Sequence, residues 1–287
     1  MHFLLALGAI SFWSTNATVA SIILQKLPVE QVQFLQFLGA FCVLAVVKVF
    51  QENERRWQVS TEAAVLGSIG LTGTMIFQYF AFYFGPIVHV NIIAYAWPVL
   101  TVLMILGSGT TSHPKRLMGL AVLGFLGASL VVSDGSQQSA QANFPVWGIL
   151  TAIGSATCMA FYSFAVGRRS VNATECLTAG ALLGVIATGI WCWLGSSHWA
   201  NIQDVLVGLY LGIGPMGVGY LLWSSALKKD RLGNVPILGF LTPITSTGVL
   251  LAMGAGASIN FIGIIGACIV IATCALVGWH SWLSSRG

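Results

Sequence analysis

The chain has 287 residues, of which 56% are hydrophobic and only 7% are charged, and its mean hydropathy is +0.86. Soluble domains carry about 25% charged residues, so most of the surface of this chain cannot face water. The net charge of +4 is small and its basic residues are scattered, which excludes a nucleic-acid-binding surface. Composition alone therefore predicts an integral membrane protein.

Long apolar runs separated by short polar breaks occupy most of the chain. A helix needs about 20 apolar residues to cross a hydrocarbon core of about 30 Å. The runs are continuous rather than alternating, which favours helices over strands, because a helix satisfies its own backbone groups in lipid. The first run lacks a preceding positive segment, so we expect it to be a retained helix rather than a cleaved signal peptide. The sequence thus predicts an all-α membrane protein with ten transmembrane helices, at residues 2–24, 30–50, 63–84, 86–107, 116–134, 145–167, 174–195, 203–227, 232–254 and 259–283.

The twelve basic residues fall almost entirely on one side of these spans. Only Lys26 falls on the other side. Loops rich in Lys and Arg stay in the cytoplasm, so we expect both termini to be cytoplasmic. The residues that define the cytoplasmic side are Lys48, Arg55, Arg56, Lys115, Arg116, Arg168, Arg169, Lys228, Lys229, Arg231 and Arg286.

The two halves of the chain resemble each other at a fixed offset of 145 residues, which places Pro98 on Pro243 and Gly67 on Gly212. Each half contains five expected spans, an odd number, so the second half must be inverted relative to the first. We therefore expect two inverted five-helix repeats, at 1–140 and 141–287, in one membrane unit. Inverted repeats of this kind are typical of transporters that work by alternating access.

Pro98 and Pro243 lie near the middle of the fourth and ninth spans. A proline inside a helix removes a backbone hydrogen bond and kinks the helix. Their matched positions favour a pair of hinges that bend during transport. The alternative is a pair of static kinks that only shape the bundle.

Aromatic and amide side chains gather at helical spacing in several spans. Asn91, Tyr95 and Pro98 share one face of the fourth span, and Trp13 and Asn16 share one face of the first. Such groups suit a cavity that stacks on a ring and hydrogen-bonds a polar end. Packing between helices is the alternative for the deep aromatic residues, whereas amides at depth are costly unless they pair or face water.

Titratable groups are scarce at membrane depth, since no Asp or Glu lies within the core of a span. This disfavours a pump coupled through a carboxylate. His89 lies about one turn inside the outer end of the fourth span and could accept a proton near neutral pH. A hydrogen-bonded interface residue is the alternative for His89, and we expect facilitated transport.

The sequence offers no signature of a catalytic or cofactor site. It contains no H-E-x-x-H, P-loop or G-x-S-x-G motif, and its six cysteines show no C-x-x-C spacing. We therefore expect no enzymatic activity, no metal and no cofactor. Small residues at Gly124 and Gly127 in the fifth span echo Gly263 and Gly266 in the tenth, which predicts close packing of two scaffold helices within a monomer.

These features together resemble a known family. Ten spans in two inverted halves, Trp13-Ser14-Thr15-Asn16 and Tyr95-Ala96-Trp97-Pro98 look like the drug/metabolite transporter superfamily, EamA type. Within it, the segment NIIAYAWPVLT at 91–101 is similar to the aromatic amino acid exporters of the YddG type. The resemblance implies a central cavity in a bacterial inner-membrane protein. Carried over to this chain, the substrate-binding positions are Trp13, Asn16, Tyr79, His89, Asn91, Tyr95, Trp97, Tyr162 and Trp223.

The function implied is export of neutral amino acids, aromatic or large and apolar, and related metabolites. The partners expected are therefore a small-molecule substrate and the lipid bilayer, with no nucleic acid. Two alternatives stay open. One is an exporter of apolar drugs or other metabolites, and the other is a channel, although the sequence shows no charged ring or filter motif.

Overall fold

The computed structural model describes residues 2–51, 59–85, 87–111, 113–134, 145–195, 201–230, 232–252 and 260–283. Within these residues, ten helical segments are long and apolar enough to cross a membrane, which confirms the predicted number of spans. The first half contains α1 (His2–Ile23), α2 (Val29–Gln51), α3 (Thr61–Gly67), the π-helix η1 (Ser68–Gly73), α4 (Thr74–Phe84), α5 (Ile87–Ala94), α6 (Trp97–Gly107) and α7 (Pro114–Asp134). The second half contains α8 (Val146–Arg168), α9 (Ala173–Gly195), α10 (Ile202–Leu211), the π-helix η2 (Gly212–Gly219), α11 (Tyr220–Lys228), α12 (Val235–Leu238), α13 (Leu241–Ala252) and α14 (Phe261–Leu283).

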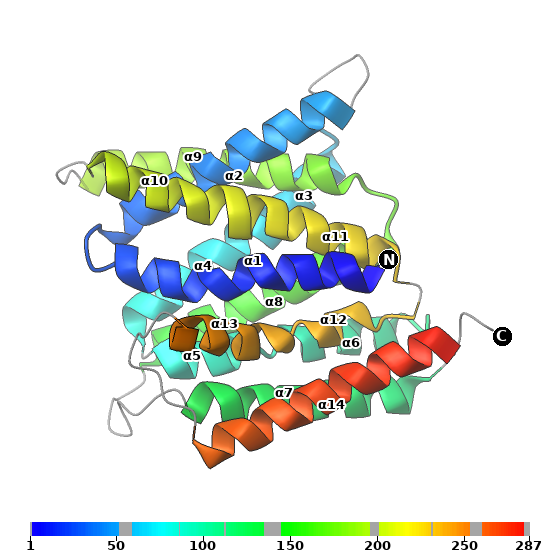
Figure 1. Ribbon diagram of the computed structural model, residues 1–287. Helices are drawn as coiled ribbons and strands as arrows, with labels where there is room; N and C mark the ends of the chain where they lie inside the picture. The colour runs from blue at the N-terminus through cyan, green and yellow to red at the C-terminus, as the bar shows by residue number, and fades with distance from the viewer. Residues whose placement is uncertain are drawn as a thin grey trace.

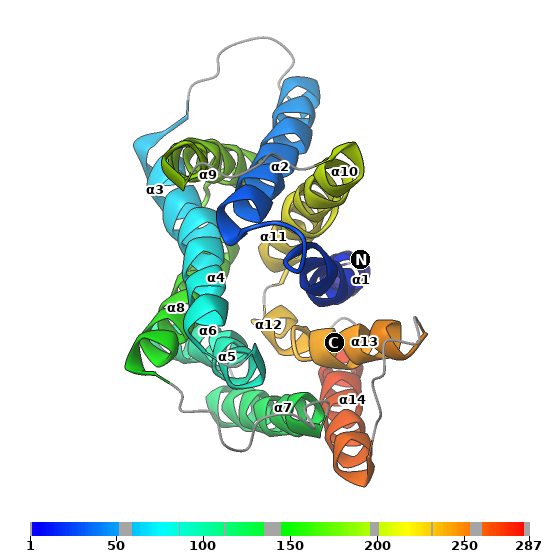
Figure 2. The same ribbon diagram turned by 90° about the vertical axis from the view of Figure 1, so that its left-hand side faces the viewer.

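The helices run roughly alongside one another, and α1 begins at the same end of the bundle at which α14 ends (Figure 1). We call this end the terminal end and the opposite one the far end. Seen along the helices, α2, α9 and α10 lie at one edge of the bundle, and α7 and α14 lie at the other (Figure 2). The described basic residues other than Lys26 lie in the first or last turns of helices at the terminal end, or directly after those helices. Arg55, Arg56, Arg231 and Arg286 lie outside the described residues.

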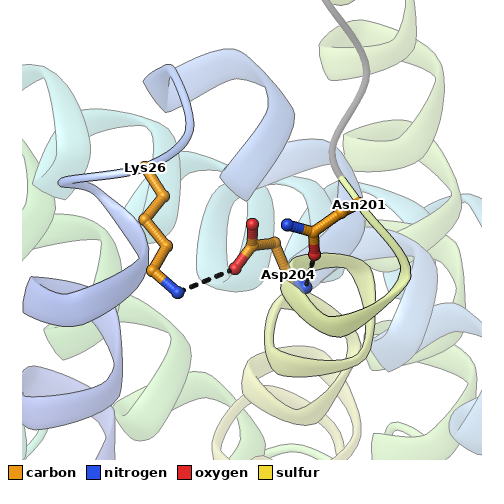
Figure 3. Close-up of polar contacts among 3 residues, drawn as sticks. All are labelled: Lys26, Asn201 and Asp204. Carbon is orange, nitrogen blue, oxygen red and sulfur yellow. Dashed lines mark hydrogen bonds and ion pairs between the residues drawn. The ribbon is translucent and has the colours of Figure 1, made fainter.

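At the far end, Lys26 ties the end of α1 to the start of α10. Its Nζ lies 3.2 Å from Oδ1 of Asp204, whose backbone N–H donates to Oδ1 of Asn201 at 2.9 Å (Figure 3). Asn201 thereby caps the first turn of α10. At the terminal end, the buried Asp230 accepts a 2.6 Å hydrogen bond from the backbone N–H of Val235. Burial raises the pKa of the Asp230 carboxyl group, although its backbone hydrogen bonds act in the opposite direction.

Four of the ten spans are interrupted, at equivalent places in the two halves. The π-helices η1 and η2 interrupt the third and eighth spans at matched positions of the repeat. The fourth span breaks between α5 and α6 immediately before Pro98, and the ninth breaks between α12 and α13 immediately before Pro243. Tighter backbone bonds close these breaks: Ala96 N–H donates to Ile93 O at 3.0 Å, and Phe240 N–H donates to Ile237 O at 3.2 Å. The prolines thus lie at helix interruptions, while their role as moving hinges stays a prediction.

Glycines at the starts of the π-helices let the two halves cross at close range. A β-carbon on Gly67 would collide with the backbone carbonyl of Cys176 in α9. At the matched position, a β-carbon on Gly212 would collide with the carbonyl oxygen of Gln36 in α2. Each half therefore places its third helix directly against the second helix of the other half.

The scaffold helices α7 and α14 meet through small residues, as their sequences suggest. A β-carbon on Gly127 would lie 2.9 Å from Gly266 O, and one on Gly266 would lie 2.6 Å from Gly127 O. The pair packs side by side along one edge of the bundle (Figure 1). This leaves α1, α4, α5, α8, α11 and α13 to surround the middle (Figure 2).

We predict that Gly67→Ala destabilises the protein by about 1–3 kcal/mol, because α3 and α9 cannot separate without losing packing elsewhere. The measurement is the midpoint of thermal unfolding of the purified protein in detergent. Gly119→Ala is the control, since a β-carbon at that position in α7 has nothing within 4 Å. An unchanged midpoint for Gly67→Ala would show that the crossing tolerates a methyl group.

Candidate functional site

A cavity of about 220 Å³ lies between the helices that surround the middle of the bundle. Both halves contribute, with side chains from α1, α2, α4, α5, α6, α8, η2, α11 and α13. Its lining comprises Trp13, Asn16, Ala20, Leu24, Gln36, Thr74, Met75, Gln78, Tyr79, Phe82, Asn91, Ala94, Tyr95, Trp97, Ser155, Ala156, Met159, Pro215, Met216, Tyr220, Thr242 and Ser246.

The cavity occupies the half of the bundle toward the far end. Leu24 follows the last turn of α1, and Phe82 lies in the last turn of α4, both near the far end. Toward the terminal end, a core of fully buried side chains such as Ile10, Tyr162 and Trp223 fills the space between the same helices. The site is therefore closed from one side of the bundle by packed side chains.

Aromatic rings form the boundary between cavity and core. The indole of Trp223 lies 5.1 Å from that of Trp13 and 5.4 Å from that of Trp97, and Trp13 contacts Tyr220 at 5.6 Å between ring centroids. We call these four residues the aromatic floor. Their tilted and edge-to-face contacts are the arrangements that aromatic pairs prefer.

The helix interruptions allow the aromatic floor to form. Nε1 of Trp13 donates to the backbone carbonyl of Pro215 at 3.0 Å, inside η2, where the α-helical bonding pattern is broken. A β-carbon on Gly239 would collide with the indole of Trp97, so the break between α12 and α13 gives that ring its place. Glycine and proline in the second half thus position two tryptophans from the first.

The polar part of the lining is neutral. It consists chiefly of amide and hydroxyl groups, including Asn16, Gln36, Gln78 and Asn91. Ser155 donates to the backbone carbonyl of Thr74 at 3.0 Å and lies 2.9 Å from Oε1 of Gln78. None of the described residues that line the cavity is Asp, Glu, Lys, Arg or His. The site therefore offers hydrogen bonds and aromatic surface but no formal charge.

Six of the nine sequence-predicted binding residues line the cavity: Trp13, Asn16, Tyr79, Asn91, Tyr95 and Trp97. Tyr162 and Trp223 lie one layer deeper and are 0% exposed. Their polar atoms bond to protein, since Tyr162 Oη lies 2.8 Å from Ser224 Oγ and Trp223 Nε1 donates to Ser163 Oγ at 3.3 Å. His89 is exposed and does not border the cavity. Substrate contact at all nine positions stays a prediction.

Several lining residues were not predicted from the sequence, notably Gln36, Ser155, Met159, Met216 and Tyr220. A glutamine in the middle of an apolar run is an available signal for Gln36, because buried amides in membrane helices are costly. The serine, the methionines and the tyrosine look like ordinary packing residues in sequence, so only their spatial convergence reveals them. Thr242 and Ser246, the repeat equivalents of Trp97 and Thr101, also face the cavity.

The described residues contain no group of three or more His, Cys, Asp or Glu side chains that could hold a metal ion.

Comparisons with known proteins place this geometry in context. The sequence pattern of the EamA-like transporter family matches residues 1–133 and 146–279, one match for each half. An aromatic amino acid exporter named YddG, from Ancylobacter novellus, is 29% identical over 209 residues, which cover 72% of each protein. A crystal structure with 24% sequence identity superposes with a TM-score of 0.84 over 99% of this chain and 98% of the other, which shows the same fold.

The family match covers nearly the whole chain, and the ten-span bundle with its two matched sets of helix interruptions agrees with it. The chain belongs to the EamA-like transporter family, and it is a membrane transporter rather than an enzyme.

Proposed function

We propose that this transporter exports neutral amino acids, aromatic or large and apolar, by alternating access. The observation that carries the proposal is the composition of the cavity wall, in which aromatic rings and neutral amides face one cavity. Rings offer apolar area with a preferred geometry, and amides offer both hydrogen-bond donors and acceptors. A zwitterion with a large apolar side chain matches both.

The absence of charge in the described lining narrows the substrate class. A phosphorylated sugar would bring a dianion into a cavity without Lys or Arg to meet it, at a large desolvation cost. A zwitterion has no net charge, and its two ionic groups can be met by neutral donors and acceptors. The name of the Ancylobacter novellus relative, an aromatic amino acid exporter, supports the same class.

The positions of the basic residues support an orientation with cytoplasmic termini in a bacterial inner membrane. In that orientation the cavity lies in the outer half of the bundle, and the aromatic floor separates it from the cytoplasm. Opening toward the cytoplasm requires the floor to come apart. The interruptions before Pro98 and Pro243 lie beside the floor and are the natural places for such bending.

Facilitated transport, in which the substrate moves down its own gradient without a coupled ion, is the simplest mechanism for this site. A coupled proton needs a group that titrates near the substrate, and the described lining contains no carboxylate and no histidine. His89 is exposed and away from the cavity, so a proton bound there does not meet the substrate.

The first prediction of the proposed function concerns substrate and carrier behaviour. Proteoliposomes loaded with unlabelled phenylalanine should take up labelled phenylalanine by saturable counterflow, because a carrier exchanges substrate across the membrane while a channel only dissipates a gradient. Tryptophan and methionine should compete, and empty vesicles without protein are the control. Folded protein without counterflow would sink the amino acid assignment and direct attention to apolar drugs, whereas non-saturable flux would indicate a channel.

The second prediction concerns Trp97. Trp97→Ala should lower the ratio of maximal rate to half-saturation concentration for phenylalanine by at least about tenfold, because the substrate loses an aromatic contact. Trp193→Ala is the matched control, since that indole is 80% exposed on the outside of the bundle. Unfolding is monitored in parallel by thermal midpoint. Equal losses of transport and of folded protein would assign Trp97 to packing instead.

The third prediction concerns the helix interruptions. Replacing Pro98 or Pro243 by alanine restores a backbone N–H and removes the ring that disfavours a continuous helix. We expect maximal counterflow to fall several-fold while the dissociation constant for phenylalanine changes less than about twofold. Pro114→Ala, at the exposed start of the scaffold helix α7, is the control. Unchanged maximal flux in both variants would remove the hinge hypothesis.

A further inference from the structure

Two glutamines of α2 are buried where the span crosses the membrane. Gln33 and Gln36 are both 0% exposed. Nε2 of Gln33 donates to Oε1 of Gln36 at 3.3 Å, which leaves Gln33 Oε1 and Gln36 Nε2 without a hydrogen bond of good geometry. A buried amide with an unused donor or acceptor is costly in lipid, so packing alone does not account for this pair.

A tyrosine from α4 faces the same pair. Tyr79 is 3% exposed, and its hydroxyl lies beside the amides of Gln33 and Gln36 without reaching the geometry of a hydrogen bond. Gln36 and Tyr79 both border the cavity. Two donors, Gln36 Nε2 and Tyr79 Oη, are therefore present at one part of the cavity wall, and neither makes a hydrogen bond of good geometry to the protein.

Asn16 of α1 supplies the complementary group. It borders the cavity, and its Oδ1 is buried without a partner. The helices α1, α2 and α4 lie in the same part of the bundle (Figure 2), and each contributes one of these residues to the cavity lining: Asn16, Gln36 and Tyr79. We call Asn16, Gln33, Gln36 and Tyr79 the polar pole.

On the aromatic side of the cavity, two polar atoms are already bonded to backbone carbonyls. Trp13 Nε1 bonds to Pro215 O, and Ser155 Oγ bonds to Thr74 O. Thr74 Oγ1 has no bond of good geometry but lies beside the Tyr220 hydroxyl. Of the four lining residues that have a fully buried polar atom without a hydrogen bond of good geometry, three belong to the polar pole, which lies nearer the far end than the aromatic floor.

We infer that the polar pole is the subsite for the α-ammonium and α-carboxylate groups of the substrate, an inference that rests on the proposed function. Asn16 Oδ1 accepts from the ammonium, and Gln36 Nε2 and Tyr79 Oη donate to the carboxylate. Gln33 is a positioning residue. It donates a hydrogen bond to Gln36 Oε1, and the Nε2 group of Gln36 therefore points away from Gln33.

This assignment fixes the direction in which the substrate binds. The charged groups of the amino acid point toward the far end, and its side chain points toward the aromatic floor. It also predicts that binding depends on the ionic groups of the substrate, which a purely apolar cavity would not require, because hydrogen bonds to ionised groups are stronger than those between neutral groups. The transporter should require both ionic groups and tolerate different apolar side chains.

The test compares phenylalanine with phenethylamine, which has the same ring and ammonium but no carboxylate. Dissociation constants are measured on the purified full chain. Wild-type protein should bind phenylalanine at least about tenfold more tightly, the factor expected for hydrogen bonds to a charged group. Gln36→Leu and Tyr79→Phe should each shrink this preference to about threefold or less by weakening phenylalanine alone.

One control variant and two further comparisons test whether the effect is specific to the subsite. Gln31→Leu changes another buried glutamine of α2 that does not border the cavity, and it should leave the preference unchanged. Tyr79→Phe removes one oxygen and keeps the ring, so it answers the question if Gln36→Leu does not fold. Asn16→Leu should weaken phenylalanine but not hydrocinnamate, which lacks the ammonium group.

The outcomes separate this inference from the proposed function. Phenylalanine counterflow by wild-type protein that shows no preference over phenethylamine would overturn the subsite alone. Variants that weaken both ligands by the same factor would do so too, because they would indicate a structural role. A wild-type protein that neither binds nor exchanges any amino acid would overturn the proposed function, and the subsite with it.

Discussion

Backbone groups inside a bilayer have no water to bond with, and the architecture of this protein depends on how it meets that constraint at its helix interruptions. Pro215 cannot donate a backbone hydrogen bond, and the π-helical turn around it rearranges the neighbouring carbonyls. The Pro215 carbonyl is bonded by Trp13 of the other half. A contact between the two halves thus satisfies a backbone group at the interruption, and the same contact puts an indole at the floor of the cavity.

The inverted repeat explains why the two halves contact each other in this way at both π-helices. In the first half, a β-carbon on Gly70 of η1 would collide with the ring of Tyr162 from α8, as Trp13 from α1 lies against Gly219 of η2 in the second half. Each π-helix is therefore covered by an aromatic residue from the opening helix of the other half. The two aromatic residues differ in chemistry, however. Tyr162 is fully buried and bonded to Ser224, whereas Trp13 borders the cavity. An approximately symmetric scaffold thereby produces an asymmetric site.

Sequence predicted the elements of this fold well, because lipid imposes length and hydropathy on every span. It placed Pro98 and Pro243 in the right helices but expected kinks, whereas the structure has full interruptions closed by tighter turns. The cavity was less predictable. Aromatic residues at depth serve as lining or as packing according to their place along the bundle and the direction of their side chains, and hydropathy encodes neither. Trp97 borders the cavity, whereas Trp223, its neighbour 5.4 Å away, lies one layer deeper and does not.

Some residues of the core and of the cavity wall differ in whether their polar atoms have hydrogen-bond partners. In the core below the cavity, buried hydroxyl and indole groups such as those of Tyr162 and Trp223 have partners within the protein. At the wall, Asn16 and Gln36 retain unpaired atoms at membrane depth. A membrane protein that kept such groups only for packing would be more stable with apolar side chains of similar volume, because lipid offers those amides nothing. Their retention is understandable if a ligand completes the hydrogen bonds, and a transporter must release that ligand in every cycle. Neutral amides suit this requirement, since they bind an ionic group firmly enough to select it and more weakly than a buried opposite charge would.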